Sequence, residues 1–137
     1  MPIRIEYSDA GRGVTLIGEG VVTADDLLNA NKEIYSRDLA AEPYDYGLFD
    51  SSGITAMPVS TDGMEALANR VMAVSGKMHD FTIAIFANSD AVSTYGQIWQ
   101  FLTGKSGWRS QIFRSRADAI AWLKDEVTKK GRPFSLK

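Results

Sequence analysis

The chain has 137 residues, the length of one domain, and can bury a hydrophobic core without disulfides or a structural metal. Apolar residues make up 45% and charged residues 23%, which is typical of globular proteins and excludes a disordered or low-complexity chain. Cysteine is absent, so disulfides, thiolate nucleophiles and cysteine metal sites are excluded. No apolar run approaches the roughly 18 residues of a membrane span, and we expect a single cytoplasmic domain over residues 1–137.

The net charge of −2 is unevenly distributed. Residues 1–66 carry 4 basic and 12 acidic side chains, whereas residues 105–137 carry 9 basic and 3 acidic ones. Such an asymmetry can steer a charged partner or favour head-to-tail self-association. Because the basic residues lie on or after a predicted terminal helix and the chain as a whole is not basic, we favour solvated side chains and expect no nucleic-acid partner.

The first predicted elements are a hairpin and a helix. The alternation of apolar and polar residues over 3–7 and the run Val14–Gly20, joined by a glycine-containing turn, predict two antiparallel strands. Thr23 and Asp26 form a capping-box pattern, which predicts a helix that ends near Arg37.

Two central strands and their connecting helix come next. Residues 45–50 read as a short buried strand, and residues 81–86 are apolar on both faces, as expected for a central parallel strand. A helix capped by Ser60 or Thr61 and ending at Gly76 separates them. The later elements are a helix from Ser89, a strand around Ile112, a helix from Ser115 and a flexible tail over residues 129–137.

Polar side chains follow both central strands. In open α/β sheets, ligands bind in the crevice beyond the carboxyl ends of the strands, and the topology predicts that the two polar segments lie side by side. An aspartate in this position can equally accept backbone N–H bonds from its own loop, so the functional and the structural interpretation both stay open. The candidate residues are Asp50, Ser51, Ser52 and Gly53 after the first strand, and Asn88, Ser89 and Asp90 after the second.

Signals for catalysis are weak. His79 is the only histidine, and no Gly-x-Ser-x-Gly elbow surrounds Ser51 or Ser52. The Gly-Lys-Ser at residues 104–106 lacks the first glycine of a phosphate-binding loop, because that position is Trp99. We predict no enzymatic activity, no metal and no other cofactor.

The order of elements resembles the STAS domain of bacterial anti-sigma factor antagonists over nearly the whole chain. Residues 49–54, Phe-Asp-Ser-Ser-Gly-Ile, are similar to the Asp-Ser-Ser/Thr-Gly-Leu loop in which those proteins are phosphorylated. The resemblance implies that Ser51 or Ser52 is a kinase target. In the antagonists a helix begins almost directly after that glycine, whereas here Thr55–Ser60 intervene.

The chain looks more like the uncharacterised bacterial STAS/CRAL-TRIO-like proteins. They show an Asp-x-x-Gly-Val/Ile-Thr loop, matched by residues 50–55, and a Tyr-Gly pair in the third helix, matched by Tyr95 and Gly96. They also show a terminal Phe-Arg…Ala-x-x-Trp-Leu, matched by residues 113–114 and 119–123. That family carries no established activity. The resemblance implies an α/β fold with one open mixed sheet of about five strands in sequential order, a hairpin followed by parallel strands, with about four helices.

Sequential strand order places all crossover helices on one face of the sheet. We expect Tyr46 and Leu48 to face these helices. The opposite face would be too apolar to remain in water, and residues 55–61, a second subunit or a lipophilic ligand could cover it. The candidate residues of this apolar face are Ile17, Phe49, Ala84 and Phe86.

We therefore expect a non-enzymatic regulatory or protein-interaction module of STAS type, phospho-regulated at Ser51 or Ser52. Its partner would be another protein or a second copy of the chain in a homo-oligomer. The alternative is a carrier of a small lipophilic ligand that binds against the apolar face.

Overall fold

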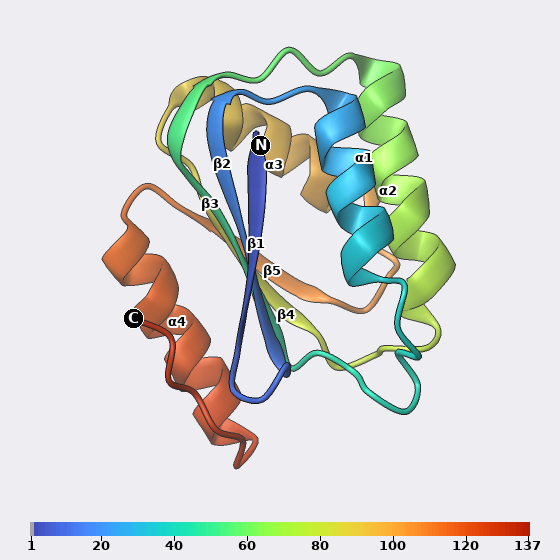
Figure 1. Ribbon diagram of the computed structural model, residues 1–137, viewed down its shortest axis with the longest axis vertical. Helices are drawn as coiled ribbons and strands as arrows, with labels where there is room; N and C mark the ends of the chain where they lie inside the picture. Colours follow the sequence, from blue (N-terminus) through green and yellow to red (C-terminus); the bar gives the residue numbers. More distant parts are fainter. Residues whose placement is uncertain (1) are drawn as a thin grey trace.

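A five-stranded sheet with the order β1-β2-β3-β4-β5 runs through the protein in the computed structural model, which describes residues 2–137 (Figure 1). β1 pairs with β2 antiparallel, and the other neighbours pair in parallel, so the predicted fold is confirmed. The strands are β1 (Ile3–Ser8), β2 (Gly13–Val21), β3 (Tyr46–Ala56), β4 (Thr82–Phe86) and β5 (Arg109–Phe113). The helices are α1 (Ala24–Ile34), α2 (Thr61–Ser75), α3 (Asp90–Leu102) and α4 (Arg116–Lys129).

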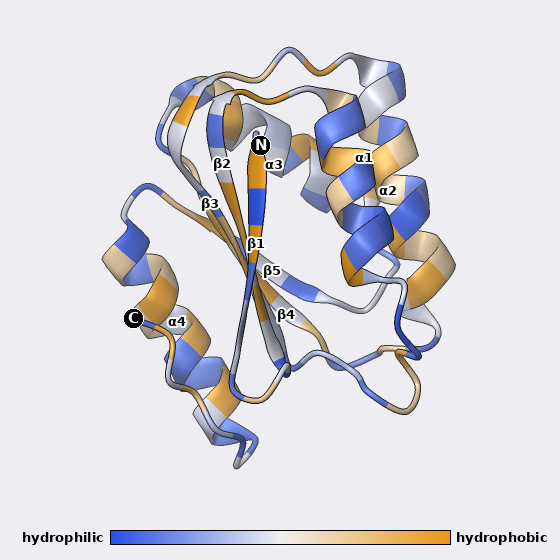
Figure 2. Cartoon of the chain, in the orientation of Figure 1, coloured by the Kyte–Doolittle hydropathy of each residue, from blue (hydrophilic) through white to orange (hydrophobic). Residues whose placement is uncertain are grey.

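Polar caps start all four helices. Thr23 and Asp26 form the predicted capping box of α1. Ser60, Ser89 and Ser115 each accept a backbone N–H bond at the start of α2, α3 and α4. Both hydrophobic and hydrophilic residues occur along the helices (Figure 2), and in α1 the buried Leu27, Ala30 and Ile34 are spaced three and four residues apart, as in an amphipathic helix.

The helices form two layers. Right-handed crossovers that all advance in one direction across the sheet place α1, α2 and α3 on the same face. α4 follows the last strand and lies on the other face (Figure 1). Its Ala119, Leu123 and Val127 are buried against the sheet. The second face is therefore covered by a helix of the same chain, which corrects our expectation of residues 55–61, a subunit or a ligand.

The side-chain orientation of β3 differs from the prediction. Tyr46 pairs with Thr82 and Leu48 pairs with Ala84, and paired residues point to the same face of a sheet. Tyr46 and Leu48 consequently lie under α4, whereas Phe49 lies on the α1–α3 face. The prediction was wrong because β3 is apolar on both faces, so its sequence does not fix which residues point which way.

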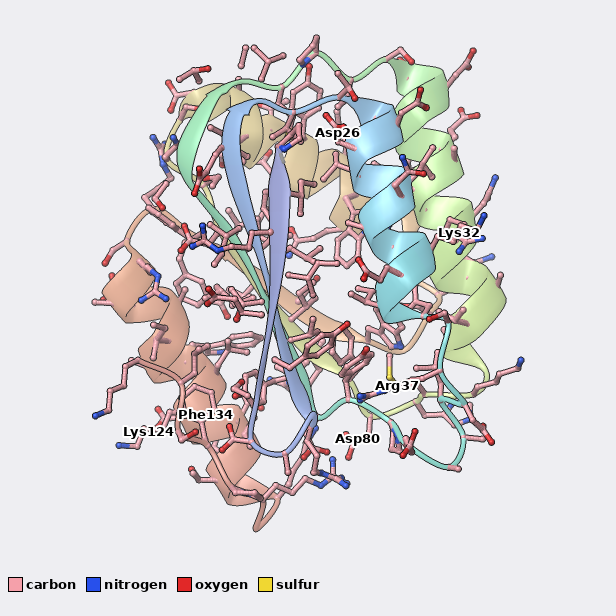
Figure 3. The ribbon with its side chains drawn as sticks, in the orientation of Figure 1. Asp26, Lys32, Arg37, Asp80, Lys124 and Phe134 are labelled. Carbon is pink, nitrogen blue, oxygen red and sulfur yellow. The ribbon has the colours of Figure 1, made fainter. Side chains whose placement is uncertain are left out.

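The segment after α4, predicted to be a flexible tail, packs on the sheet. Phe134 lies on the α4 side, with its ring centroid 4.8 Å from that of Tyr46 (Figure 3). The Ser135 amide donates to Asp9, and Arg132 pairs with the buried Asp45 at 3.0 Å. Some of the basic charge at this end of the chain therefore pairs with acidic side chains from the first half, where we expected solvated side chains.

None of the helices within residues 2–137 is both long enough and apolar enough to cross a membrane.

Candidate functional site

A β-bulge shapes the Asp50–Gly53 segment. Ile17 pairs with Asp50 and Glu19 pairs with Gly53, so β3 carries one extra residue relative to β2 over this interval. The segment is therefore strand, not the predicted loop, and β3 continues to Ala56 beyond the last residue of β4. Bulges bend a strand and redirect its side chains, and they are frequent next to functional sites.

Ser51 is sealed inside the protein. Its hydroxyl donates to the Phe86 carbonyl at 2.6 Å and accepts from the Asn88 amide at 2.8 Å. The pairing of β3 with β4 ends at Asp50 and Phe86, and the Ser51 side chain links β3 to the residues that follow. The exposed fraction of Ser51 is 0%. A fully hydrogen-bonded, buried hydroxyl is a structural group, and it is inaccessible to another protein without local unfolding.

Ser52 and Gly53 are exposed beside the ion pair of Asp50 and Arg116. The Ser52 amide donates to Asp50 Oδ1 at 2.9 Å, and Arg116 Nε donates to Asp50 Oδ2 at 2.9 Å. Arg116 also donates to the main-chain oxygen of Lys137. We call Ser52, Asp50 and Arg116 the bulge triad.

Asp50 is ionised and is a weak base. Burial acts to raise its pKa, but hydrogen bonds from Ser52 and the charge of Arg116 outweigh this and hold the pKa below its ordinary value. A carboxylate with a lowered pKa has little tendency to take a proton from the Ser52 hydroxyl. The bulge triad is therefore better suited to presenting a fixed charge pattern than to general base chemistry.

The predicted neighbouring segment lies beside the bulge. Asn88 donates from its backbone to Ser51 and from its side chain to the Ile54 carbonyl at 3.0 Å. Ser89 is the N-cap of α3, and the exposed Asp90 pairs with Arg114 at 2.7 Å. The structure thus brings Asn88 together with Ser51, as the topology predicted, whereas Ser89 and Asp90 form the start of α3.

The other catalytic arrangements considered from the sequence are not assembled. His79 precedes β4, whereas Ser51 contacts the residues that follow β4, so the two lie at opposite ends of that strand. Within residues 2–137, no group of three His, Asp or Glu side chains has the proximity needed to hold a metal ion.

The four residues assigned to one apolar face are divided between both faces. Ala84 and Phe86 lie with the α4 cluster, and Ile17 pairs with Asp50, whose side chain meets Arg116 of α4. Phe49 packs on the α1–α3 side. The surface formed by all four therefore does not exist.

Arg116 was missed as a site residue. It is separated from Asp50 by 66 positions, and the sequence around it reads only as the start of a helix. The available signal was indirect, because a carboxylate on a buried strand requires a cation or several hydrogen bonds. This rule predicts that some group neutralises the Asp50 carboxylate, but it does not identify the residue that supplies that group.

The sequential five-stranded sheet, with three crossover helices on one face and α4 on the other, is a STAS-like α/β fold. The chain is similar in structure to an uncharacterised protein of the DUF3478 family from Shewanella loihica PV-4, described as having a SpoIIAA-like fold. The TM-score is 0.57 at 18% identity, over 88% of this chain and 91% of that one. This likeness supports the STAS-like part of the resemblance and gives no support to the CRAL-TRIO-like part. No family model and no curated protein matches the sequence.

Proposed function

We propose that this protein is a non-enzymatic interaction module of STAS type whose contact surface includes the bulge triad, with phosphorylation at Ser52 as the switch. The observation that carries the proposal is the difference between the two serines. Ser51 is buried, whereas Ser52 is exposed beside a fixed carboxylate and a guanidinium. A kinase can reach the exposed Ser52 hydroxyl without local unfolding, whereas it cannot reach that of Ser51.

A phosphate on Ser52 would change the charge of this surface. It adds about −1.5 to −2 at neutral pH and lies next to Asp50, which is already ionised. Arg116 would then be shared by two anionic groups. A protein partner that binds the unmodified surface through acidic groups would be repelled, whereas a basic partner would be attracted.

Phosphorylation is tested on protein isolated from its native host. Intact-mass analysis followed by peptide mapping is expected to show one phosphate, on Ser52 and not on Ser51. The Ser52→Ala variant, expressed in the same host, should carry none, and Ser51→Thr, which keeps the hydroxyl, should still be modified at Ser52. A phosphate on Ser51, or no phosphorylated fraction in any growth phase, would contradict the switch.

The interaction surface is tested separately by quantitative affinity capture from the host lysate. Ser52→Asp should change the amount of at least one captured partner, whereas Thr94→Asp, at an exposed position on α3, should leave that partner unchanged. Equal capture of every partner by the wild type, Ser52→Asp and Thr94→Asp would contradict the assignment of this surface.

A further inference from the structure

The two faces of the sheet are packed to different depths. α4 comes close to the backbones of β3, β4 and β5, and the fully buried Ala84 and Ala119 allow this approach. On the other face, α1 comes closest to the sheet at β1 and α3 at β5, while α2 packs mainly against α1 and α3. The centre of the sheet therefore has no helix directly on it on this side.

A cavity of about 110 Å³ occupies this space. Its floor is formed by β3 and β4, its roof by α2 and its walls by α1 and α3. Phe49 and Ile83, at the centre of the floor, remain partly exposed. Side chains at the centre of a sheet that lies under a helical layer are ordinarily fully buried, and natural cores keep few voids larger than a water molecule.

The lining of the cavity extends along the strands of the sheet. Phe81, Ile83 and Ile85 all line it, and four residue steps along a strand at about 3.3 Å each correspond to about 13 Å. A flexible chain can adapt to a volume of about 110 Å³ under a lining of that length more easily than a rigid ring system can. Met57 and Met64 also line it, and flexible thioether side chains adapt to the shape of an apolar occupant.

The lining is almost wholly apolar. No Lys, Arg, His, Asp or Glu of residues 2–137 contributes to it. Its polar side chains include Asn31 on α1, Tyr35 directly after α1 and Tyr95 on α3, all partly exposed. The Tyr35 hydroxyl is neutral at physiological pH, and burial raises its pKa further above the ordinary value. An apolar lining favours hydrocarbon ligands, whereas a charged group would lose its hydration without gaining a counter-ion.

We propose that the cavity between the central strands and α2 binds an uncharged aliphatic chain, such as an acyl or prenyl chain, with its polar end near Asn31, Tyr35 or Tyr95. The lipophilic ligand would thus lie on the α1–α3 face, opposite to the α4 face where most of the predicted apolar residues lie. This site is separate from the Ser52 surface, so either proposal can fail without the other.

The test uses 1-decanol as the probe, with native mass spectrometry for stoichiometry and thermal unfolding for stabilisation. We expect one decanol bound per chain and an increase in Tm with concentration. Decanoate should bind at least about tenfold more weakly than decanol, because its carboxylate finds no cation in the lining. Binding of decanoate equal to that of decanol would overturn the assignment of a neutral ligand.

Two variants link binding to the cavity. Val71→Phe fills the roof and should weaken decanol binding by about tenfold or more, whereas Val74→Phe adds the same volume on the same helix outside the lining and should bind like the wild type. Ile83→Phe, on the floor, serves as a second filling variant if Val71→Phe does not fold. No decanol adduct and no Tm shift in the wild type, or unchanged binding by a folded filling variant, would overturn the proposal.

Discussion

Arg116 Nε lies 2.9 Å from Asp50 Oδ2, and this ion pair joins the first turn of α4 to the bulge of β3. The Asp50 side chain is 6% exposed and that of Arg116 is 37% exposed. The two partners are therefore not equivalent. Loss of the arginine leaves a buried carboxylate without its cation, whereas loss of the carboxylate leaves a guanidinium that water can still reach.

We expect Arg116→Ala to lower the free energy of unfolding by about 1–3 kcal/mol. The matched control is Arg4→Ala, which removes an arginine whose two partners, Glu6 and Glu19, are both exposed and should change stability by less than about 1 kcal/mol. Equilibrium urea unfolding at neutral pH measures both. Equal losses in the two variants would mean that the pair of Asp50 and Arg116 behaves as a surface ion pair.

We expect the substitution of Ser51 to destabilise the protein more than the substitution of Ser52, because only Ser51 is buried. Ser51→Ala leaves the Phe86 carbonyl and the Asn88 amide without their partner and should cost about 1–3 kcal/mol. Ser52→Ala leaves the backbone bond to Asp50 in place and should cost about 0.5 kcal/mol or less. Chemical denaturation compares the variants, and the assignment fails if Ser52→Ala is the more destabilised one.

The sequence specified the order of the elements because each carries a local signal. Thr23 with Asp26, Ser60, Ser89 and Ser115 mark helix starts through hydrogen bonds that span three residues, and all of them cap helices in the structure. Residues 82–86 form a strand because the run is short, apolar and rich in β-branched residues. Helix caps and short apolar strands depend only on residues that are close in sequence, so they can be predicted from it.

The parts that could not be predicted depend on distant residues. The orientation of β3 is set by pairing with β2 and β4, because the strand is apolar on both faces. The bulge that separates Ser51 from Ser52 exists only relative to β2, and a local pattern cannot reveal it. The covering of the second face by α4 follows from where the chain goes after β5, which periodicity does not encode.

Phe134 is expected to anchor the segment after α4. Its ring packs on Tyr46, which is fully buried, so Phe134→Ala should cost about 1–3 kcal/mol, less than for a fully buried aromatic residue. Lys137→Ala, which removes an exposed side chain from the same segment, should change the free energy of unfolding by less than about 0.5 kcal/mol. Hydrogen exchange adds a local readout, since amide protection at Ser135 should fall in Phe134→Ala alone. Unchanged stability and protection would indicate a solvated tail, as the sequence suggested.

The same substitution is expected to have different effects at two glycines. Gly76, at the end of α2, has φ −64°, and a Cβ at this position would have no atom within 4 Å, so Gly76→Ala should stabilise by about 0.4–1 kcal/mol. In α3, a Cβ at Gly96 would lie 3.0 Å from Ile112 Cδ1, which opposes the gain in helix propensity. Thermal unfolding should show a higher Tm for Gly76→Ala only. A similar increase in Gly96→Ala would show that α3 can move away from β5 at no cost.

Acid is expected to destabilise the protein through carboxylates whose pKa values are lowered on folding. Burial acts to raise the pKa values of Asp50 and Asp9. Hydrogen bonds from Ser52 and Arg116 nevertheless lower the pKa of Asp50 overall. Hydrogen bonds from Tyr46 and Ser135 do the same for Asp9. The hydrogen bond from Lys130 lowers the pKa of Asp80. A carboxylate with a lowered folded-state pKa stabilises the protein above its unfolded-state pKa of about 3.9, and this contribution is lost as the pH falls through the folded-state value.

The free energy of unfolding should therefore decrease from about pH 5 toward about pH 2, with urea unfolding at each pH as the measurement. Asp50→Asn keeps the size of the side chain but removes its titration, so its stability should fall less steeply over this range. The slope should decrease by at most about 1.4 kcal/mol per pH unit, the value for one proton. The exposed Asp62→Asn is the control and should keep the wild-type slope. Parallel curves for wild type and Asp50→Asn would mean that Asp50 has the same pKa in both states and that Arg116 does not stabilise its charge.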